Sequence, residues 1–147
     1  MPSLPLLPLL ALTTLALACT SSSGPSQTYD EHLKAWQAVQ PPAYEFEYSM
    51  GCFCIGTGVW WRVQVDHGTF VTATRVDPSG PVVRVPRHLT MDSVFAEAKR
   101  AIDGPNDSVG ITYDANWHHP AAIHVDPRKE VADDERSLLV REVRAVP

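Results

Sequence analysis

Residues 59–76, VWWRVQVDHGTFVTATRV, constrain the fold more than any other stretch, because two alternating runs flank a His-Gly pair. Alternation with a period of two predicts β-strands with one buried face, and His67-Gly68 is a typical two-residue hairpin turn. Folding the arms on that turn predicts these facing pairs on the buried side: Val65 with Phe70, Val63 with Thr72, Trp61 with Thr74 and Val59 with Val76. The opposite side then carries Trp60, Arg62, Gln64, Asp66, Thr69 and Arg75. His67 is accordingly expected to form a turn rather than to act as a catalyst.

Other alternating segments predict further strands beside this hairpin. In residues 44–50, YEFEYSM, the aromatic side chains share one face and the polar ones the other, so one face is expected to be buried. Three more strands are predicted by the same pattern, at residues 108–114, 121–126 and 136–143. Short connections between these segments favour antiparallel pairing.

Helical spacing predicts two helices. The first covers residues 29–40 and is ended by a Pro-Pro pair. The second covers residues 91–102, with Thr90 as its N-cap and Gly104 after its end. The predicted fold class is α+β: a single, mainly antiparallel sheet of about six or seven strands, with one or two helices packed on one face.

The N-terminus resembles an export signal. No charged residue occurs from Leu4 to Ala18, and this apolar stretch is shorter than the roughly 20 residues that a membrane-spanning helix needs. The sequence LALAC, ending at Cys19, resembles the lipobox of bacterial lipoproteins, in which the cysteine thiol is acylated, for example with palmitate. The Ala-Leu-Ala sequence also fits a cleavage site that would release a soluble protein. The Ser-, Gly- and Pro-rich residues that follow Cys19 favour the lipid anchor, because they suit a flexible tether.

The predicted organisation is a signal peptide over residues 1–18, a lipidated Cys19 with a flexible tether over 19–28, and one globular domain over 29–147. We expect an exported protein, lipid-anchored to the bacterial cell membrane or the outer membrane and facing the periplasm or the exterior. A net charge of −5 without a basic cluster argues against nucleic acid and against binding of anionic lipid through the folded surface. Membrane contact is expected through lipid on Cys19, the candidate partners are an envelope protein or a cell-wall component, and no cofactor is expected.

Two further cysteines, Cys52 and Cys54, would remain if Cys19 carries lipid. Disulfides persist in export compartments, and an even number of thiols favours pairing. In a flat strand, residues two apart have Cα atoms roughly 6.5 Å apart, near the upper limit for a disulfide, but the surrounding glycines favour a bend. A local disulfide is the favoured interpretation. The alternatives are free thiols, a redox pair, or a metal site completed by His118, His119 or His124.

Two other groups of residues are candidate sites. One group offers oxygen ligands for a metal such as Ca²⁺: Asp126, Asp133, Asp134 and Glu135. Their spacing does not match a calcium-binding loop, so a solvated loop is favoured. The other group is a loop cluster of the kind that binding sites use, although an exposed turn is favoured here: Trp117, His118 and His119. The common catalytic motifs are missing from the sequence.

The order of these features resembles a family of small bacterial envelope proteins, the domain-of-unknown-function family 6174. Its pattern has an aromatic strand leading into Cys-x-Cys, a hairpin with glycine, a helix with phenylalanine, and Tyr-Asp, Pro-x-x-Ile-x-x-Asp and Asp-Asp-Glu elements. The matching positions are Tyr44, Phe46, Tyr48, Cys52, Cys54, Gly68, Phe95, Tyr113, Asp114, Pro120, Ile123, Asp126, Asp133, Asp134 and Glu135. The chain departs from the pattern in NWHHP, where a Gly-aromatic-x-Pro turn is usual, and in a last strand without an aromatic residue. The resemblance implies a fold and leaves the chemistry open.

The favoured hypothesis is an uncharacterised bacterial envelope lipoprotein that acts as a non-catalytic binding or assembly module. One alternative is a thiol-redox or metal-handling protein that uses Cys52 and Cys54. A second alternative is an enzyme whose site is not visible in the sequence.

Overall fold

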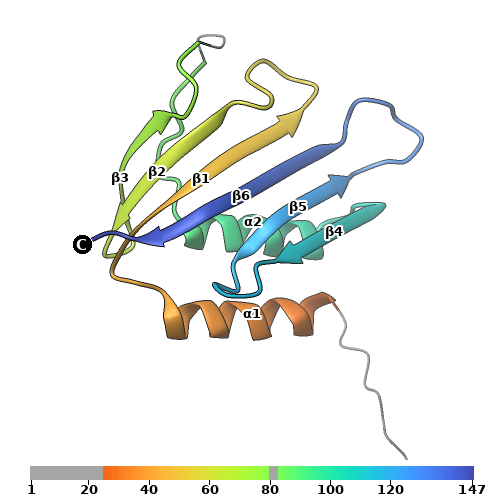
Figure 1. The fold of residues 1–147 in the computed structure, drawn as a ribbon. Coiled ribbons are helices and arrows are strands. Elements are labelled where there is room, and N and C mark those ends of the chain that lie inside the picture. The colour runs from red at the N-terminus through yellow and green to blue at the C-terminus, as the bar shows by residue number, and fades with distance from the viewer. Residues whose placement is uncertain (1–24, 80–82) are drawn as a thin grey trace, which may run out of the picture.

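The structure is a computed structural model that describes residues 25–79 and 83–147, so the predicted signal peptide and Cys19 lie outside the described residues. The described elements are α1 Pro25–Val39, β1 Ala43–Cys52, β2 Trp60–Asp66, β3 Thr69–Arg75, α2 Met91–Asp103, β4 Ser108–Tyr113, β5 Pro120–Asp126 and β6 Arg136–Ala145 (Figure 1). The strands form one sheet in the order β3-β2-β1-β6-β5-β4, and all neighbours are antiparallel.

Both helices lie on the same face of the sheet (Figure 1). The predicted α+β class, with one antiparallel sheet and helices on one face, is confirmed. The first helix begins at Pro25, earlier than the predicted start at Tyr29, so it includes residues that the sequence suggested for the tether.

Helix α2 is fixed by caps at both ends. The Thr90 hydroxyl accepts a hydrogen bond from the backbone N–H of Ser93, and the Ser93 hydroxyl accepts one from the backbone N–H of Thr90. This capping box satisfies two backbone donors that the first turn leaves free. At the other end, the N–H of Gly104 donates to the carbonyl of Arg100 at 2.9 Å. The apolar stripe of α2, which includes Val94 and Phe95, is buried as the sequence predicts.

Helix α1 is held through two aromatic side chains. Trp36 is fully buried, and its ring meets the edge of Tyr44, near the start of β1, with centroids 5.4 Å apart. Near the other end of the helix, Tyr29 packs edge-on against Phe95 of α2 at 5.9 Å. These contacts tie α1 to the second helix and to the central part of the sheet.

Strand β1 is buried on both faces, which corrects the prediction of one buried face. Tyr44 and Phe46 face the helices, as expected. On the opposite face, however, the side chains of Glu45, Glu47 and Ser49 are also buried, and the two glutamates are only 6% and 4% exposed. A carboxylate is costly to bury without partners, so these positions need compensating charges from the neighbouring strands.

Three arginines supply those charges, and we call this set the glutamate–arginine network. Arg62 on β2 donates from Nη2 to Glu47 Oε1 at 2.7 Å, and Arg141 on β6 donates from Nε to Oε2 at 2.9 Å. Arg144 donates from Nε to Glu45 Oε1 at 2.7 Å. The arginines are partly exposed while the carboxylates lie beneath them. The network therefore covers the open face of β1.

A bulge in β6 makes this arrangement geometrically possible. The register shifts so that Glu47 faces Arg141 and Glu45 faces Arg144, although the arginines are three positions apart and the glutamates two. Glu142, within the shifted segment, has a positive φ of 55°. One extra residue in one strand of an antiparallel pair produces this kind of displacement.

The predicted hairpin is present, but its register is corrected beyond the turn. His67 and Gly68 both have positive φ, as in a two-residue hairpin turn. Phe70 faces Val65 as predicted, whereas Val63 faces Ala73 instead of Thr72, because the pairing shifts by one residue between Gln64 and Val65.

The shift changes which β3 side chains share the helix-facing side. Trp61 faces Arg75, not Thr74, and Thr74 faces Arg62. On β2 itself the predicted faces hold, since Trp61 is buried and Trp60 is only half-buried.

Among the described residues, no helix is long and apolar enough to cross a membrane.

The two adjacent tryptophans of β2 provide a test of this register. Trp61 lies in the core, and replacing it with alanine is expected to cost about 3–5 kcal/mol. Trp60 lies on the open face with the Arg141 guanidinium 3.7 Å from its ring centroid, so Trp60→Ala is expected to cost only about 1 kcal/mol. Urea unfolding of both variants measures the difference, and equal losses would contradict the assignment of faces.

Candidate functional site

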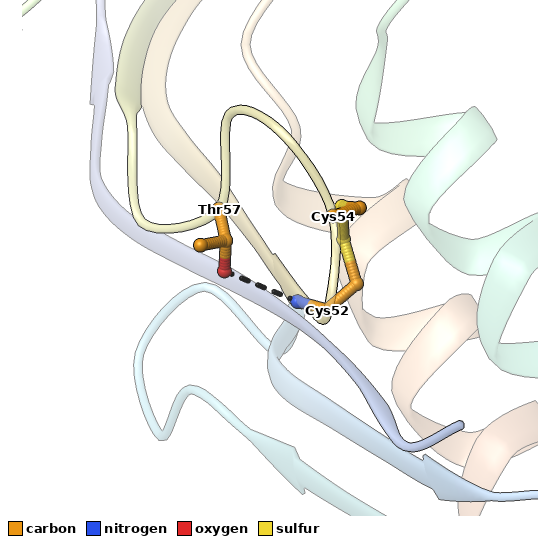
Figure 2. Close-up of a disulfide and its surroundings, with 3 residues drawn as sticks. All are labelled: Cys52, Cys54 and Thr57. Atoms are coloured by element: carbon orange, nitrogen blue, oxygen red, sulfur yellow. Dashed lines mark hydrogen bonds between the residues drawn. A yellow bond between two sulfur atoms is a disulfide. The ribbon is translucent and has the colours of Figure 1, made fainter. Parts of the chain in front are cut away.

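The cysteine loop, residues 52–59, leads from the end of β1 to β2 and contains both cysteines of the Cys-x-Cys sequence (Figure 2). In the structure, Cys52 and Cys54 lie together as a disulfide pair, with Cα atoms 5.2 Å apart. This separation is compatible with the predicted bond, because disulfides usually join Cα atoms 4.4–6.8 Å apart. The backbone N–H of Cys52 also donates to the hydroxyl of Thr57 at 3.2 Å. The loop is thus bent back upon itself.

Two large apolar side chains project from this loop. Phe53 is 82% exposed and Ile55 is 92% exposed. Single exposed apolar residues are common on protein surfaces and need no explanation. Here, however, they are two positions apart on one short loop and next to a hollow that Ile55 also lines. The loop is therefore a candidate contact surface.

The hollow is a groove of about 600 Å³ on the helix-facing side of the sheet, between the ends of β1 and β2 and the β3–α2 connection. Tyr48, Met50 and Trp61 line it from the strands. A second hollow, of about 300 Å³, shares Tyr48 and Met50 and continues beside α2. We call the two together the cysteine-loop groove.

Positive charge predominates along the cysteine-loop groove. Its lining includes four arginines, namely Arg84, Arg87, Arg100 and Arg136, and one acidic residue, Glu97. Glu97 forms ion pairs with Arg100 and, at 3.9 Å, with Arg136. Within the part of the chain that the structure describes, neither Arg84 nor Arg87 forms an ion pair. The groove therefore combines apolar strand residues with arginines available to an acidic group.

The WHHP residues form the turn between β4 and β5. Asp114 Oδ1 accepts hydrogen bonds from the backbone N–H groups of Asn116 and Trp117, at 2.8 and 2.6 Å. These bonds outweigh the effect of burial and hold the pKa of Asp114 below its usual range. Trp117 packs against the core, and His118 has a positive φ of 62°. This geometry fits the turn that the sequence favours.

His119 in the same turn is buried. Its Nδ1 lies 3.0 Å from the carbonyl oxygen of Pro120, and its ring lies near that of Trp36 with centroids 6.4 Å apart. Burial lowers the pKa of His119, despite the opposing effect of that carbonyl. A buried imidazole with a backbone partner suits a structural role in this turn.

The four acidic candidates lie at the end of β5 and in the β5–β6 loop. Asp134 pairs with Arg128 at 3.1 Å, Asp133 adopts a positive φ of 70°, and Glu135 is exposed. In residues 25–79 and 83–147, no group of three or more His, Cys, Asp and Glu side chains is placed to hold a metal. This holds for Asp126 and its neighbours, and for the cysteine pair with His118, His119 or His124.

One half-buried pair of stacked rings was not predicted from the sequence. His32 of α1 stacks on Tyr113 of β4 with ring centroids 3.9 Å apart, and it lies 5.7 Å from His118. Burial, followed by the proximity of His118, lowers the pKa of His32, and burial raises the pKa of Tyr113 to about 12. The signal was present, because His32 lies three residues after Tyr29 and four before Trp36, on the buried stripe of α1.

The sequence also did not predict that the residues of the groove come together. The segment from Tyr48 to Trp61 contains no charged residue, and this feature could have drawn attention to the cysteine loop. Nothing in the sequence places Arg84 and Arg87 beside that loop, because their position depends on the path of the β3–α2 connection.

Comparison with known proteins bears on family membership alone. The model of a family described as "Family of unknown function (DUF6174)" matches residues 28–145, which include all six strands and α2. No curated protein and no solved structure matches the chain. The comparison carries no activity to this protein.

The disulfide can be tested by removing it. Cys52→Ser combined with Cys54→Ser is expected to leave a folded domain that is destabilised by about 1–2 kcal/mol, because so short a ring removes little entropy from the unfolded chain. Urea unfolding measures the loss, and peptide mapping without reductant is expected to recover the two cysteines linked. Two free thiols, or a stoichiometric metal that the double variant loses, would contradict the bond.

Proposed function

The chain belongs to DUF6174, a family of unknown function, and we propose that it is a non-catalytic binding module that acts through the cysteine-loop groove. One observation carries this proposal: a groove lined by apolar strand residues, and by two arginines that form no ion pair with any described residue, opens beside a loop that exposes Phe53 and Ile55. Apolar surface next to positive charge is suited to recognising a partner of matching chemistry.

The partner that fits best is an envelope protein that presents an apolar segment flanked by acidic side chains. Tyr48, Met50 and Trp61 offer apolar and aromatic contact area to the segment. Arg84 and Arg87 offer guanidinium groups that can form two parallel hydrogen bonds with a carboxylate. The net charge of −5 would repel most acidic proteins from the rest of the surface. An acidic segment is therefore expected to bind only at the groove, where the arginines lie.

The charges of the groove suit binding better than catalysis. Arginine stays protonated at neutral pH and cannot exchange protons as a general acid or base. Glu97, the acidic residue of the groove, is already engaged by Arg100 and Arg136. The arginines can hold an anionic side chain in place without transferring a proton.

We also propose that the module is exported and held at the membrane by lipid on Cys19. The support is the LALAC sequence, the uncharged segment before it and the small, polar residues after it. An anchored binding module would search for its partner within the plane of a membrane, where weak contacts suffice because the effective concentration is high.

A second candidate function is thiol–disulfide exchange. Cys54 is exposed at the loop, so a dithiol of another protein could reach it. The partner would be oxidised to a disulfide while Cys52 and Cys54 are reduced to two thiols. This function needs both cysteines, whereas binding through the groove needs the arginines and the apolar residues.

Site-specific photocrosslinking in intact cells tests the binding function. A photoreactive amino acid in place of Val85, which lines the groove and is partly exposed, is expected to give a discrete crosslinked product. The matched control places it at Val71, which is also exposed but lies on the edge strand β3. Crosslinking of both positions to the same proteins would contradict a specific groove.

Charge reversal identifies the chemistry of the contact. Arg84→Glu with Arg87→Glu is expected to abolish the Val85 product, whereas Lys34→Glu on the exposed side of α1 leaves it intact. The Cys52→Ser, Cys54→Ser variant distinguishes the two functions, since binding predicts that a product remains and exchange predicts that it disappears. A product unaffected by arginine reversal would exclude recognition of an acidic segment.

A further inference from the structure

The tip of the cysteine loop has the properties of a membrane-contacting loop. It belongs to the uncharged segment from Tyr48 to Trp61, and Phe53 and Ile55 at its tip are 82% and 92% exposed. Phe53 lies between the paired cysteines, so the short ring restricts its retreat toward the core. The two apolar side chains are held outward before any contact forms.

The backbone of the loop also satisfies many of its own polar groups. Thr57 accepts from the N–H of Cys52, and Cys54 donates to the carbonyl of Cys52 at 2.8 Å. Gly58 donates to the carbonyl of Met50 at 3.0 Å. Backbone groups without partners are costly in the poorly hydrated region of a bilayer. Internal bonding therefore lowers the cost of moving this loop out of water.

Helix α1 begins on the side of the domain toward which β1 runs (Figure 1). Helix α2 runs in the same direction as β1, because its first residue, Met91, contacts Tyr44 at the start of β1, while Glu97 lies 3.9 Å from Arg136, which faces Cys52. Helix α1 runs opposite to α2 (Figure 1). The first turn of α1 is therefore directed toward the end of the sheet where β1 enters the cysteine loop.

The chain between the proposed lipid and α1 is short. Only residues 20–24 separate Cys19 from the first residue of α1, and that length of chain spans at most about 20 Å. If Cys19 is held in a bilayer, the side of the domain toward which β1 and the cysteine loop point is the side turned toward the same surface.

We propose that Phe53 and Ile55 insert into the interface of the membrane that holds Cys19, so that lipid anchor and loop together orient the domain. This inference rests on the proposed lipid anchor. The apolar contact does not require anionic headgroups, which agrees with the acidic net charge of the chain. A contact of two side chains is weak alone, but the anchor makes it intramolecular and raises the local concentration of membrane. The cysteine-loop groove, which shares Ile55, then opens at the bilayer surface.

Fluorescence of the full-length, lipid-modified protein in vesicles tests this orientation. An environment-sensitive fluorescent amino acid replaces Phe53 in one variant and Val71 in the control, and the vesicles contain phosphatidylethanolamine and phosphatidylglycerol with a quencher-labelled lipid. At position 53 we expect a blue shift and a loss of intensity to the lipid quencher. At position 71, on β3, we expect the emission of a water-exposed residue.

The other outcomes separate the loop from the anchor. If the protein sediments with the vesicles but position 53 emits like position 71, the loop proposal is overturned and the anchor stands. If the protein carries no lipid and does not sediment with vesicles, both are overturned. If position 53 is shielded in cell envelopes but exposed in pure lipid vesicles, a protein covers the loop and the membrane proposal is wrong.

Discussion

The position of Glu47 between Arg62 and Arg141 is the constraint on which the rest of the sheet depends. Strand β1 lies in the middle of the sheet, between β2 and β6, and its apolar face is buried under the helices. On the opposite face of β1, the side chains of Glu45 and Glu47 are buried as well, so their carboxylates are not hydrated as surface carboxylates would be. The glutamate–arginine network compensates for that burial and links three strands with charged hydrogen bonds, which are stronger than neutral ones.

A central strand fixed on both faces gives the cysteine loop a rigid base. Strand β1 ends at Cys52. The pairing of Cys52 with Cys54 forms a small ring at the start of the loop. The side chains at the tip are then presented by a firm scaffold, which reduces the entropy lost when they meet a partner or a membrane. Our proposals for the groove and for the loop both depend on this preorganisation.

The sequence predicted the features that local chemistry determines. The hairpin turn at His67-Gly68, the Thr90 cap of α2 and the strand positions follow from turn propensity, capping and periodicity, and the structure confirms them. The burial of Glu47 was missed because its partner Arg141 lies 94 residues away in sequence. The register beyond the hairpin turn was wrong because the pairing shifts between Gln64 and Val65, and neither the alternation nor the turn residues predict such a shift. The groove was missed because the connection between β3 and α2 forms one wall, and the path of such a connection does not follow from local sequence patterns.

The pH dependence of stability tests the central role of the network most directly. Burial alone would raise the pKa of Glu47, but hydrogen bonds from Arg62 and Arg141 outweigh it, so the pKa lies below its usual value of 4.5. The folded state thus favours the charged carboxylate, whose stabilisation is complete above the unfolded pKa and is lost as pH falls through the folded one. Urea unfolding at pH 7 is expected to show Glu47→Gln less stable than the native protein by about 1–3 kcal/mol, a difference that disappears in acid, while the exposed control Glu130→Gln changes little. Equal stability of the Glu47→Gln variant and the native protein at pH 7, or a difference that persists unchanged in acid, would contradict the account.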